Sequence, residues 1–171
     1  MRVLIAYYSR TGVTRKTCSA VADVLRSLDD SIEVQVEEIE DRTDRSGARG
    51  YLAGGKDAML RRPTEIGPVE AEVGSFDLVV IGTPVWAWTC APAPRTFCEQ
   101  FAQQIDRAAF VATMGGSGDR GAFKALAECC GVEPLATLTL LEKYVKSDDE
   151  ENYRGRIEEF ARELATKAGG Q

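Results

Sequence analysis

The chain has 171 residues, a formal net charge of −6 and no histidine. Its length predicts one domain over residues 1–171, and its negative charge argues against binding to nucleic acid or to an anionic membrane surface, since both need a basic surface. The absence of histidine excludes Ser-His-Asp and Cys-His catalysis and removes the commonest ligand of transition metals, so we predict no metal site.

The first residues and the cysteines indicate a cytoplasmic location. Met1 and Arg2 lead straight into a short apolar run, which is interrupted too soon for a secretory signal peptide. No run approaches the ~18 apolar residues that a membrane span needs. The five cysteines are odd in number and follow no C-x2-C spacing, which indicates neither a disulfide framework nor a zinc site. We therefore expect a reduced, cytoplasmic protein.

Five short segments rich in apolar residues are predicted to be strands. Four of them are continuous apolar runs, over residues 2–8, 76–82, 109–114 and 134–141. Runs of this kind are typical of a parallel sheet that is covered on both faces. Residues 31–39 instead alternate Ile32, Val34 and Val36 with polar residues, so we expect that strand to be half exposed near an edge of the sheet.

Amphipathic segments separate these strands. Apolar side chains recur at helical spacing over residues 18–28, 97–105, 123–130 and 153–164. A further helix is predicted over 48–60, weakened by Gly54 and Gly55. The arginine-rich region 42–62 is predicted to be a solvated surface, and the alternative is that it covers the edge of a bound ring or attracts an anionic substrate. The alternation of strands and helices predicts an α/β fold, a doubly wound three-layer α/β/α sandwich around a five-stranded parallel sheet.

The segment Ser9-Arg10-Thr11-Gly12-Val13-Thr14 joins the first strand to the first helix. Ligands of a doubly wound sheet bind beyond the carboxyl ends of its strands, where the unpaired N–H groups at a helix start favour an anion. The hydroxyls of Ser9, Thr11 and Thr14 can donate to phosphate oxygens, and Gly12 lets the backbone approach closely. An ordinary helix cap is the alternative, but a cap needs one hydroxyl rather than three. The segment therefore predicts a phosphate-binding loop.

Residues 82–94 follow the third predicted strand and contain Trp86 and Trp88 beside prolines that stiffen a loop. A flat aromatic ligand stacked on one indole would explain two tryptophans in such a loop. The alternative, which we expect for at least one of the pair, is packing onto the core. This loop is therefore the predicted binding place of a planar ring.

The stretch after the fourth predicted strand contains Gly116, Gly118 and Gly121, which match the G-x-G-x-x-G fingerprint of dinucleotide-binding domains. Glu142 follows the next strand at about the right distance for that interpretation. However, such a fingerprint normally follows a first strand, and here the first strand already carries the better anion loop. Instead, Gly115 and Gly116 leave backbone amides bare beside a ligand, and we expect Gly121 only to start a helix. Together the three loops predict a site for a mononucleotide with an aromatic ring.

These residues resemble the flavodoxin-like family over nearly the whole chain. Flavodoxins begin with a strand and then S/T-x-T-G-x-T, which holds the phosphate of FMN, and Ser9–Thr14 has this pattern with Val13 where Asn is frequent. The resemblance implies the strand order 2-1-3-4-5 and the short-chain form, because the fifth strand is uninterrupted. It implies that FMN is bound by three segments: Ser9, Arg10, Thr11, Gly12, Val13 and Thr14; Thr83, Pro84, Val85, Trp86, Ala87 and Trp88; Met114, Gly115, Gly116, Ser117 and Gly118.

The patterns "YYSRTGVT" and "GTPVWA" look closest to the branch that includes NAD(P)H-dependent oxidoreductases. That resemblance implies an FMN-dependent enzyme that reduces a quinone or a similar small acceptor with NAD(P)H. The alternative is a flavodoxin-type electron carrier between protein partners. Carriers often have a glycine in the loop after the third strand, whereas no glycine lies between Thr83 and Phe97. Because positive φ is costly without glycine, this departure favours two-electron chemistry over one-electron transfer.

Overall fold

A parallel sheet forms the centre of the molecule in a computed structural model that describes residues 1–169, apart from the side chain of Tyr51. In spatial order, its strands are β2 (Glu33–Glu38), β1 (Arg2–Tyr7), β3 (Leu78–Trp86), β5 (Ala108–Met114) and β6 (Pro134–Leu141). Counted along the chain, these five long strands have the predicted order 2-1-3-4-5. The alternating strand is at an edge of the sheet, as predicted.

The carboxyl end of β3 differs from the prediction. The residues Thr83–Trp86 were expected in a loop, but they extend β3, and a sixth, short strand β4 (Thr89–Cys90) pairs with them antiparallel. In this hairpin Val85 lies opposite Cys90 and Trp86 lies opposite Thr89, so Ala87 and Trp88 alone form the turn. The apolar run ends at Gly82, but backbone pairing with a later segment carries the strand further than the run indicates.

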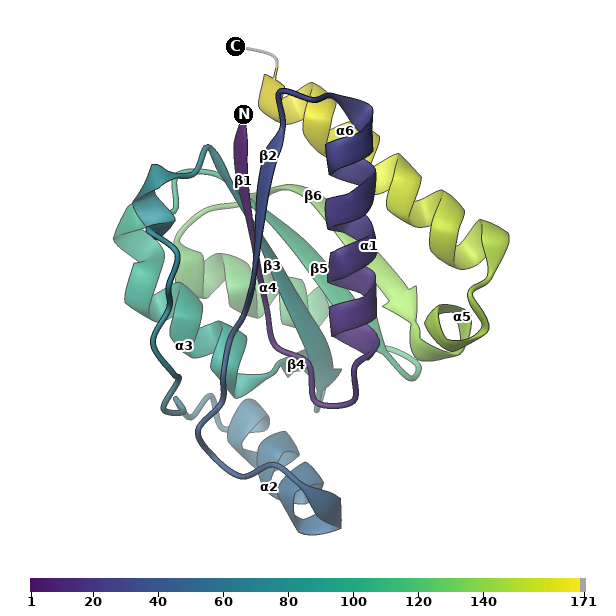
Figure 1. Cartoon of the computed structure of the whole chain (residues 1–171). Helices are drawn as coiled ribbons and strands as arrows, with labels where there is room; N and C mark the ends of the chain where they lie inside the picture. The colour runs from purple at the N-terminus through teal and green to yellow at the C-terminus, as the bar shows by residue number, and fades with distance from the viewer. Residues whose placement is uncertain (170–171) are drawn as a thin grey trace.

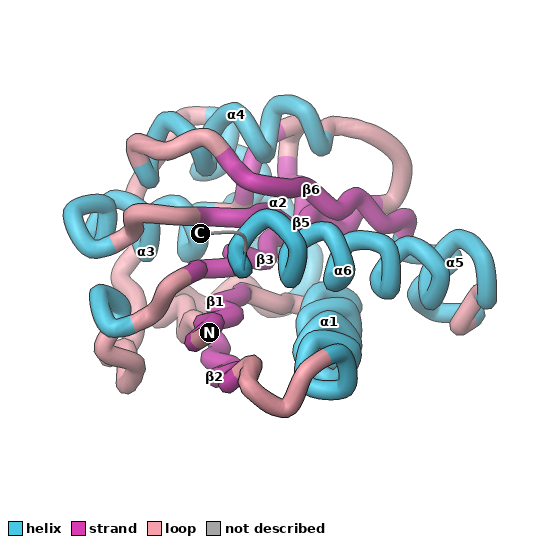
Figure 2. Tube along the Cα trace, turned by 90° about the horizontal axis from the view of Figure 1, so that it is seen from above, coloured by secondary structure: helices cyan, strands magenta, loops and turns pink. Residues whose placement is uncertain are grey.

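Two pairs of helices cover the two faces of the sheet (Figure 2). The helices α1 (Val13–Leu28) and α6 (Arg156–Gly169) lie on one face, and α3 (Pro92–Phe101) and α4 (Asp119–Cys130) lie on the other. The alternation of each strand feeds both layers, since Val3 and Ile5 pack toward α1 and α6 while Leu4 and Ala6 pack toward α3 and α4. This is the predicted three-layer sandwich.

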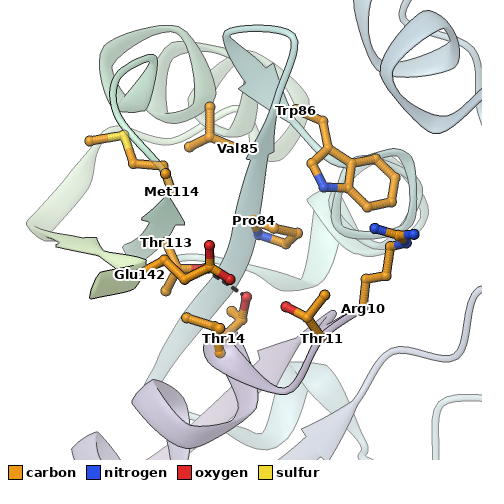
Figure 3. A pocket seen from close by; sticks show the side chains of 11 residues that line it. Arg10, Thr11, Thr14, Pro84, Val85, Trp86, Thr113, Met114 and Glu142 are labelled. Carbon is orange, nitrogen blue, oxygen red and sulfur yellow. Dashed lines mark hydrogen bonds between the residues drawn. The ribbon is translucent and has the colours of Figure 1, made fainter. Parts of the chain in front are cut away.

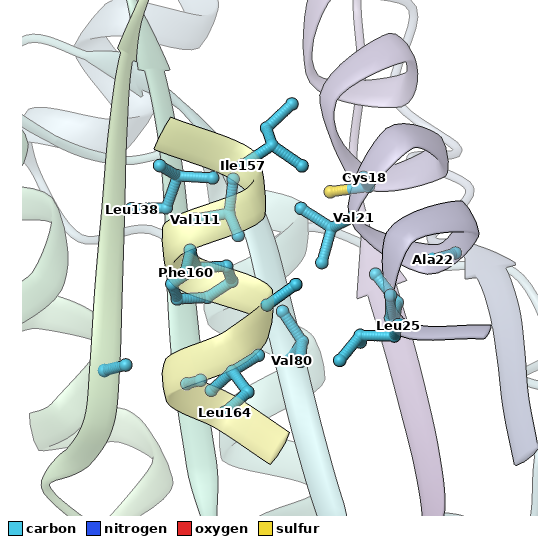
Figure 4. Packing of buried hydrophobic residues seen from close by; sticks show 14 of the residues in the cluster. Cys18, Val21, Ala22, Leu25, Val80, Val111, Leu138, Ile157, Phe160 and Leu164 are labelled. Carbon is cyan, nitrogen blue, oxygen red and sulfur yellow. The ribbon is translucent and has the colours of Figure 1, made fainter. Parts of the chain in front are cut away.

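The layer formed by α1 and α6 shows why the helical stripes were readable in the sequence. Figure 4 shows Leu25 of α1 together with Phe160 and Leu164 of α6 over Val80 of β3. Leu25 and Leu164 are completely buried. Burial of such a side chain stabilises the fold by about 1.5–3 kcal/mol. None of the helices in residues 1–169 is both long and apolar enough to cross a membrane.

The connection from β2 to β3 contains α2 (Gly47–Met59), which lies beyond the carboxyl ends of the strands and not on a face of the sheet (Figure 1). Arg45 fixes the start of this excursion: its side chain is 5% exposed and forms ion pairs with Asp41 at 3.1 Å and Asp57 at 2.6 Å. The prediction of a solvated arginine surface is therefore wrong for Arg45. Removing one partner of a buried ion pair costs about 3–5 kcal/mol.

The carboxyl-terminal helical region is divided into three parts. The helix α5 (Glu142–Ser147) follows β6 directly, a wide helical turn covers Glu150–Gly155, and α6 follows. The carboxylate of Asp149 accepts the backbone N–H of Asn152 at 2.7 Å, which caps the wide turn. Short 3-10 turns at Val73–Ser75 and Ala102–Gln104 complete the described elements. Glu142 thus begins a helix at the carboxyl edge of the sheet, near the carboxyl ends of β1, β3 and β5.

Candidate functional site

A cavity of about 190 Å³ opens at the carboxyl edge of the sheet, between the segment after β1 and the ends of β3 and β5 (Figure 3). The predicted site residues that line it are Arg10, Thr11, Val13, Thr14, Pro84, Val85, Trp86, Met114 and Gly115. Thr113 and Glu142 also line it. The structure therefore brings the three predicted segments together at one place, as the topology of a doubly wound sheet requires.

The start of α1 forms one end of this cavity. Gly12 precedes the helix with φ 86°, and no side chain caps the helix start. The hydroxyl of Ser9 accepts the N–H of Gly12 at 3.1 Å, so Ser9 shapes the loop and does not line the cavity. The first N–H groups of a helix have no partner within the helix, and the helix dipole favours an anion there. The starts of α2, α3 and α4 also lack a side-chain cap, so it is the location of the α1 start at the cavity that supports the phosphate-loop interpretation.

Two buried hydroxyls join this helix start to β5. Thr14 and Thr113 are almost completely buried, and their Oγ1 atoms lie 2.8 Å apart in a hydrogen bond (Figure 3). Arg10 links the same loop to the start of α2, since its guanidinium donates to the carbonyl oxygens of Arg45 at 2.9 Å and Gly47 at 3.0 Å. This end of the cavity is thus held both to the sheet and to α2.

Trp86 forms a wall at the other end of the cavity. It is 7% exposed and packs edge-on against Tyr8, with ring centroids 5.6 Å apart. Burial, and secondarily the charge of Asp41, raises the pKa of Tyr8 to about 12, so this phenol stays neutral. Trp86 is the tryptophan of the pair that packs onto the core, as expected for at least one of them.

The hairpin turn that follows Trp86 has a strained backbone. Ala87 has φ 47° and Trp88 has φ 61°, the pattern of a type I′ turn, which normally takes glycine or asparagine. A non-glycine residue in the left-handed region costs about 1–2 kcal/mol. Thr83 secures the base of the hairpin, because its buried hydroxyl accepts the N–H of Ala91 at 3.0 Å and donates to the Pro84 carbonyl at 2.8 Å. Thr83 therefore has a structural role and does not line the cavity.

The glycines after β5 divide between the cavity and the hairpin. An added Cβ at Gly115 or Gly116 would meet no atom within 4 Å, and only Gly115 lines the cavity. A Cβ at Gly121 would lie 2.0 Å from the carbonyl oxygen of Trp88, and one at Gly118 would lie 2.8 Å from the Val85 side chain. The expectation that Gly121 only starts a helix is therefore wrong, because this glycine lets the hairpin pack on α4.

The remaining predicted residues lie beside the cavity and not in its lining, and Gly12 is one of them. Ala87, Trp88 and Ser117 line a neighbouring groove together with residues of α2. Cys90 belongs to strand β4 of the hairpin and is buried, and burial raises the pKa of its thiol to about 11. It lines neither the cavity nor the groove.

The sequence analysis did not predict Thr113 as a site residue, and it considered Glu142 only for the dinucleotide-binding interpretation. Thr113 lies inside the apolar run that predicted β5, and its hydroxyl at the carboxyl end of that strand was the available signal. Glu142 is the first residue after β6, at the same edge of the sheet, and its carboxylate pairs with Lys146 at 3.0 Å. The rule that ligands bind at this edge applies to the segment after every strand, so it pointed to Glu142 as well.

Solved structures share this fold. A flavoprotein from Lactobacillus acidophilus NCFM in complex with FMN is 22% identical, with a TM-score of 0.64 over 88% of this chain and 95% of that one. A flavodoxin from Streptococcus pneumoniae TIGR4 is 20% identical, with a TM-score of 0.56 over 98% and 99%. A short-chain flavodoxin associated with a bacterial microcompartment is 15% identical, with a TM-score of 0.60 over 98% and 99%.

The sequence matches a family model, whereas no curated protein matches the chain. The family model described as Flavodoxin matches residues 2–156, which span the chain from β1 to the start of α6. This match includes all three segments of the cavity and agrees with the strand order and with the fold of the solved structures. The chain therefore belongs to the flavodoxin family.

Proposed function

We propose that the protein binds FMN in the cavity at the carboxyl edge of its sheet. The observation that carries this proposal is the uncapped start of α1, which shares one cavity with the walls formed by Pro84, Trp86 and Met114. A Cβ at Gly12 would meet no atom within 4 Å, and its neighbours Thr11 and Val13 line the cavity. The Lactobacillus flavoprotein of the same fold, which was solved with FMN, adds support.

In this proposal the two ends of the cavity have different tasks. The N–H groups after Gly12 and the exposed hydroxyl of Thr11 hold the phosphate, which the helix dipole also stabilises. Pro84, Trp86 and Met114 give the flat ring apolar surface. When bound, FMN supplies the capacity to take up a hydride and to pass electrons on, while the protein supplies binding and orientation.

We further propose that the protein is an NAD(P)H-dependent oxidoreductase that reduces a quinone or a similar small acceptor. Reduction of a quinone to a hydroquinone takes two electrons and two protons, which NAD(P)H supplies as a hydride and solvent supplies as a proton. Ala87 and Trp88 adopt positive φ without a glycine, so the missing glycine does not by itself favour two-electron chemistry, contrary to the sequence argument. The rigidity of the hairpin supports two-electron chemistry instead. The Trp88 carbonyl is packed against Gly121, and pairing between β3 and β4 closes the turn. Rotation of a peptide plane in this turn would disrupt the packing on Gly121 and the strand pairing.

Electron transfer between protein partners is the second candidate. The exposed side chains of Leu52, Met59 and Trp88 near the cavity favour it, because exposed apolar surface beside a redox site can contact another protein. Steady-state oxidation of NADH or NADPH with a soluble quinone distinguishes the two functions. An enzyme turns over with the purified protein alone, whereas a carrier needs a separate reductase.

Titration of the flavin-free protein tests cofactor binding directly. We expect one FMN per chain to bind, and riboflavin, which lacks the phosphate, to bind about 100-fold more weakly, or ~3 kcal/mol. The quenching of flavin fluorescence measures both dissociation constants. The proposal is wrong if added FMN produces no change, or if FMN and riboflavin bind equally.

A further inference from the structure

A groove of about 530 Å³ lies beside the cofactor cavity, between α2 and the β3–β4 hairpin. We call it the α2 groove, and its walls include Leu52, Lys56, Met59, Val85, Trp86 and Trp88. Val85 and Trp86 also line the cofactor cavity, so the two spaces share a wall.

Large apolar side chains gather at this groove and are exposed. Leu52 is 71% exposed, Met59 is 63% exposed and Trp88 is 72% exposed. Leu52 and Met59 lie seven residues apart on α2, which places them on the same helix face as Lys56. A contiguous apolar patch of this kind marks a binding surface more often than single scattered residues do.

Two contacts hold α2, which forms one wall of the groove, in place. Gly54 of α2 lies directly against the Trp86 ring, since an added Cβ would be 2.6 Å from Cζ3 of that indole. Asp57 ties the same helix to the buried Arg45 at 2.6 Å. On the opposite wall, the strained turn places Trp88 outward from the hairpin. Backbone strain of this kind is typical of functional sites.

Lys56 gives the groove a positive charge. Within residues 1–169, no carboxylate lies within 4 Å of its ammonium group, whereas the neighbouring Asp57 is paired with Arg45 and Arg62. A lysine on an apolar wall, with no paired carboxylate, is placed to attract an anionic group of a bound molecule.

We infer that the α2 groove binds the small electron acceptor and selects planar aromatic molecules that carry an anionic substituent. Leu52, Met59 and Trp88 contact the aromatic body, and Lys56 attracts the anionic group. The wall shared with the cofactor cavity places the acceptor next to the ring-binding end. This inference rests on the proposed function, because it assigns the acceptor of that same site.

Anthraquinone-2-sulfonate and its neutral sulfonamide analogue test the inference as a matched pair. Calorimetric titration of the oxidised, FMN-loaded protein without an electron donor measures binding and no turnover. We expect the sulfonate to bind about fivefold more tightly than the sulfonamide, the size of one exposed ion pair. Lys56→Gln should abolish this preference. Lys167→Gln, the same charge change on α6, should keep it.

A second variant tests the aromatic wall. Trp88→Ala should weaken the binding of both ligands by about tenfold and leave the preference for the sulfonate unchanged. The inference is overturned if the wild type binds both ligands equally, if Lys56→Gln keeps the preference, or if Trp88→Ala binds as the wild type does. It is also overturned if sedimentation shows that a second copy of the chain covers the groove and excludes the sulfonate.

These results separate the inference from the proposed function. FMN binding with NAD(P)H turnover, but with no dependence of ligand choice on Lys56, overturns the inference alone. Lys56-dependent binding of the sulfonate without NAD(P)H turnover leaves the groove assigned and overturns the proposed electron donor. Absence of FMN binding overturns the proposed function itself.

Discussion

The two ends of the candidate site are built in different ways. The phosphate end consists of backbone groups and short side chains inside the layers of the fold: the start of α1, Ser9, and the buried pair Thr14–Thr113. The groove end consists of long, exposed side chains on α2, which lies outside those layers, and of Trp88 on a strained turn. The phosphate end depends on the topology of the sheet, and the groove end depends on α2, which lies outside the layers in the connection from β2 to β3.

This difference suggests a division of tasks. A site made of helix N–H groups at a strand end recognises a phosphate, whatever molecule carries it. A site made of exposed side chains on a connecting segment can change its specificity without disturbing the core. We therefore expect changes at the phosphate end to alter cofactor affinity and changes at the groove end to alter ligand choice and stability.

Gly12→Val should have the largest effect, on affinity for FMN. Gly12 has φ 86° at the start of α1, and a branched side chain there would strain the backbone and fill the space open to the phosphate. We expect the dissociation constant of FMN to rise about 100-fold, or ~3 kcal/mol, measured by flavin fluorescence.

Gly131→Val is the matched control. Gly131 also has positive φ, 74°, and open space around its missing Cβ, but it follows the end of α4, whereas Gly12 lies between Thr11 and Val13, which line the cavity. It should lose similar stability and keep wild-type affinity for FMN. Equal loss of affinity in both variants would show that strain, and not the location at the phosphate end, explains the effect.

Gly54→Ala and Gly55→Ala test the attachment of the groove end. A Cβ at Gly54 would lie 2.6 Å from Trp86, whereas a Cβ at Gly55 would meet nothing within 4 Å. Both variants gain helix propensity, but only the first one overpacks. We expect the free energy of unfolding of Gly54→Ala to be ~2 kcal/mol below that of Gly55→Ala, measured by urea denaturation. Equal stabilities would mean that α2 is not held against Trp86.

Thr14→Val and Thr113→Val test the attachment of the phosphate end. Each single change leaves the other buried hydroxyl without its partner, and we expect each to reduce the free energy of unfolding by ~1.5 kcal/mol. The double variant should be less destabilised than the sum of the two. A double-mutant cycle in urea measures this coupling, and strict additivity would contradict the hydrogen bond.

Trp88→Gly should have the smallest effect and the opposite sign. Glycine adopts φ 61° without strain, so the free energy of unfolding should rise by ~1 kcal/mol and Tm by about 2–4 °C in thermal denaturation. The same variant should bind anthraquinone-2-sulfonate more weakly than the wild type. A fall in Tm would contradict the view that the turn is strained to present the indole.

Much of the fold could be predicted from the sequence. The strands β1, β3, β5 and β6 could be predicted from their apolar runs, because each strand is covered on both faces and needs apolar residues throughout. The phosphate end was also readable, because its geometry arises from one continuous segment, Ser9–Thr14.

Other features were not readable because distant residues decide them. The hairpin depends on pairing of Val85 with Cys90 and on space left by Gly121, and neither shows in an apolar pattern. Gly54 was expected to weaken a helix, but the same missing side chain admits the Trp86 ring. Arg45 was expected at the surface because local sequence does not show that Asp41 and Asp57 will surround it.

The sequence by itself determined the order of the long strands and helices, the family resemblance and the loop proposed to hold the phosphate, because hydrophobic periodicity and a contiguous loop motif are local properties. Only the tertiary structure decided that α2 leaves the layers, that Trp86 is buried while Trp88 is exposed, and that Thr113 and Glu142 join the cavity. Those outcomes depend on contacts between segments far apart in the chain, which one linear pattern does not record.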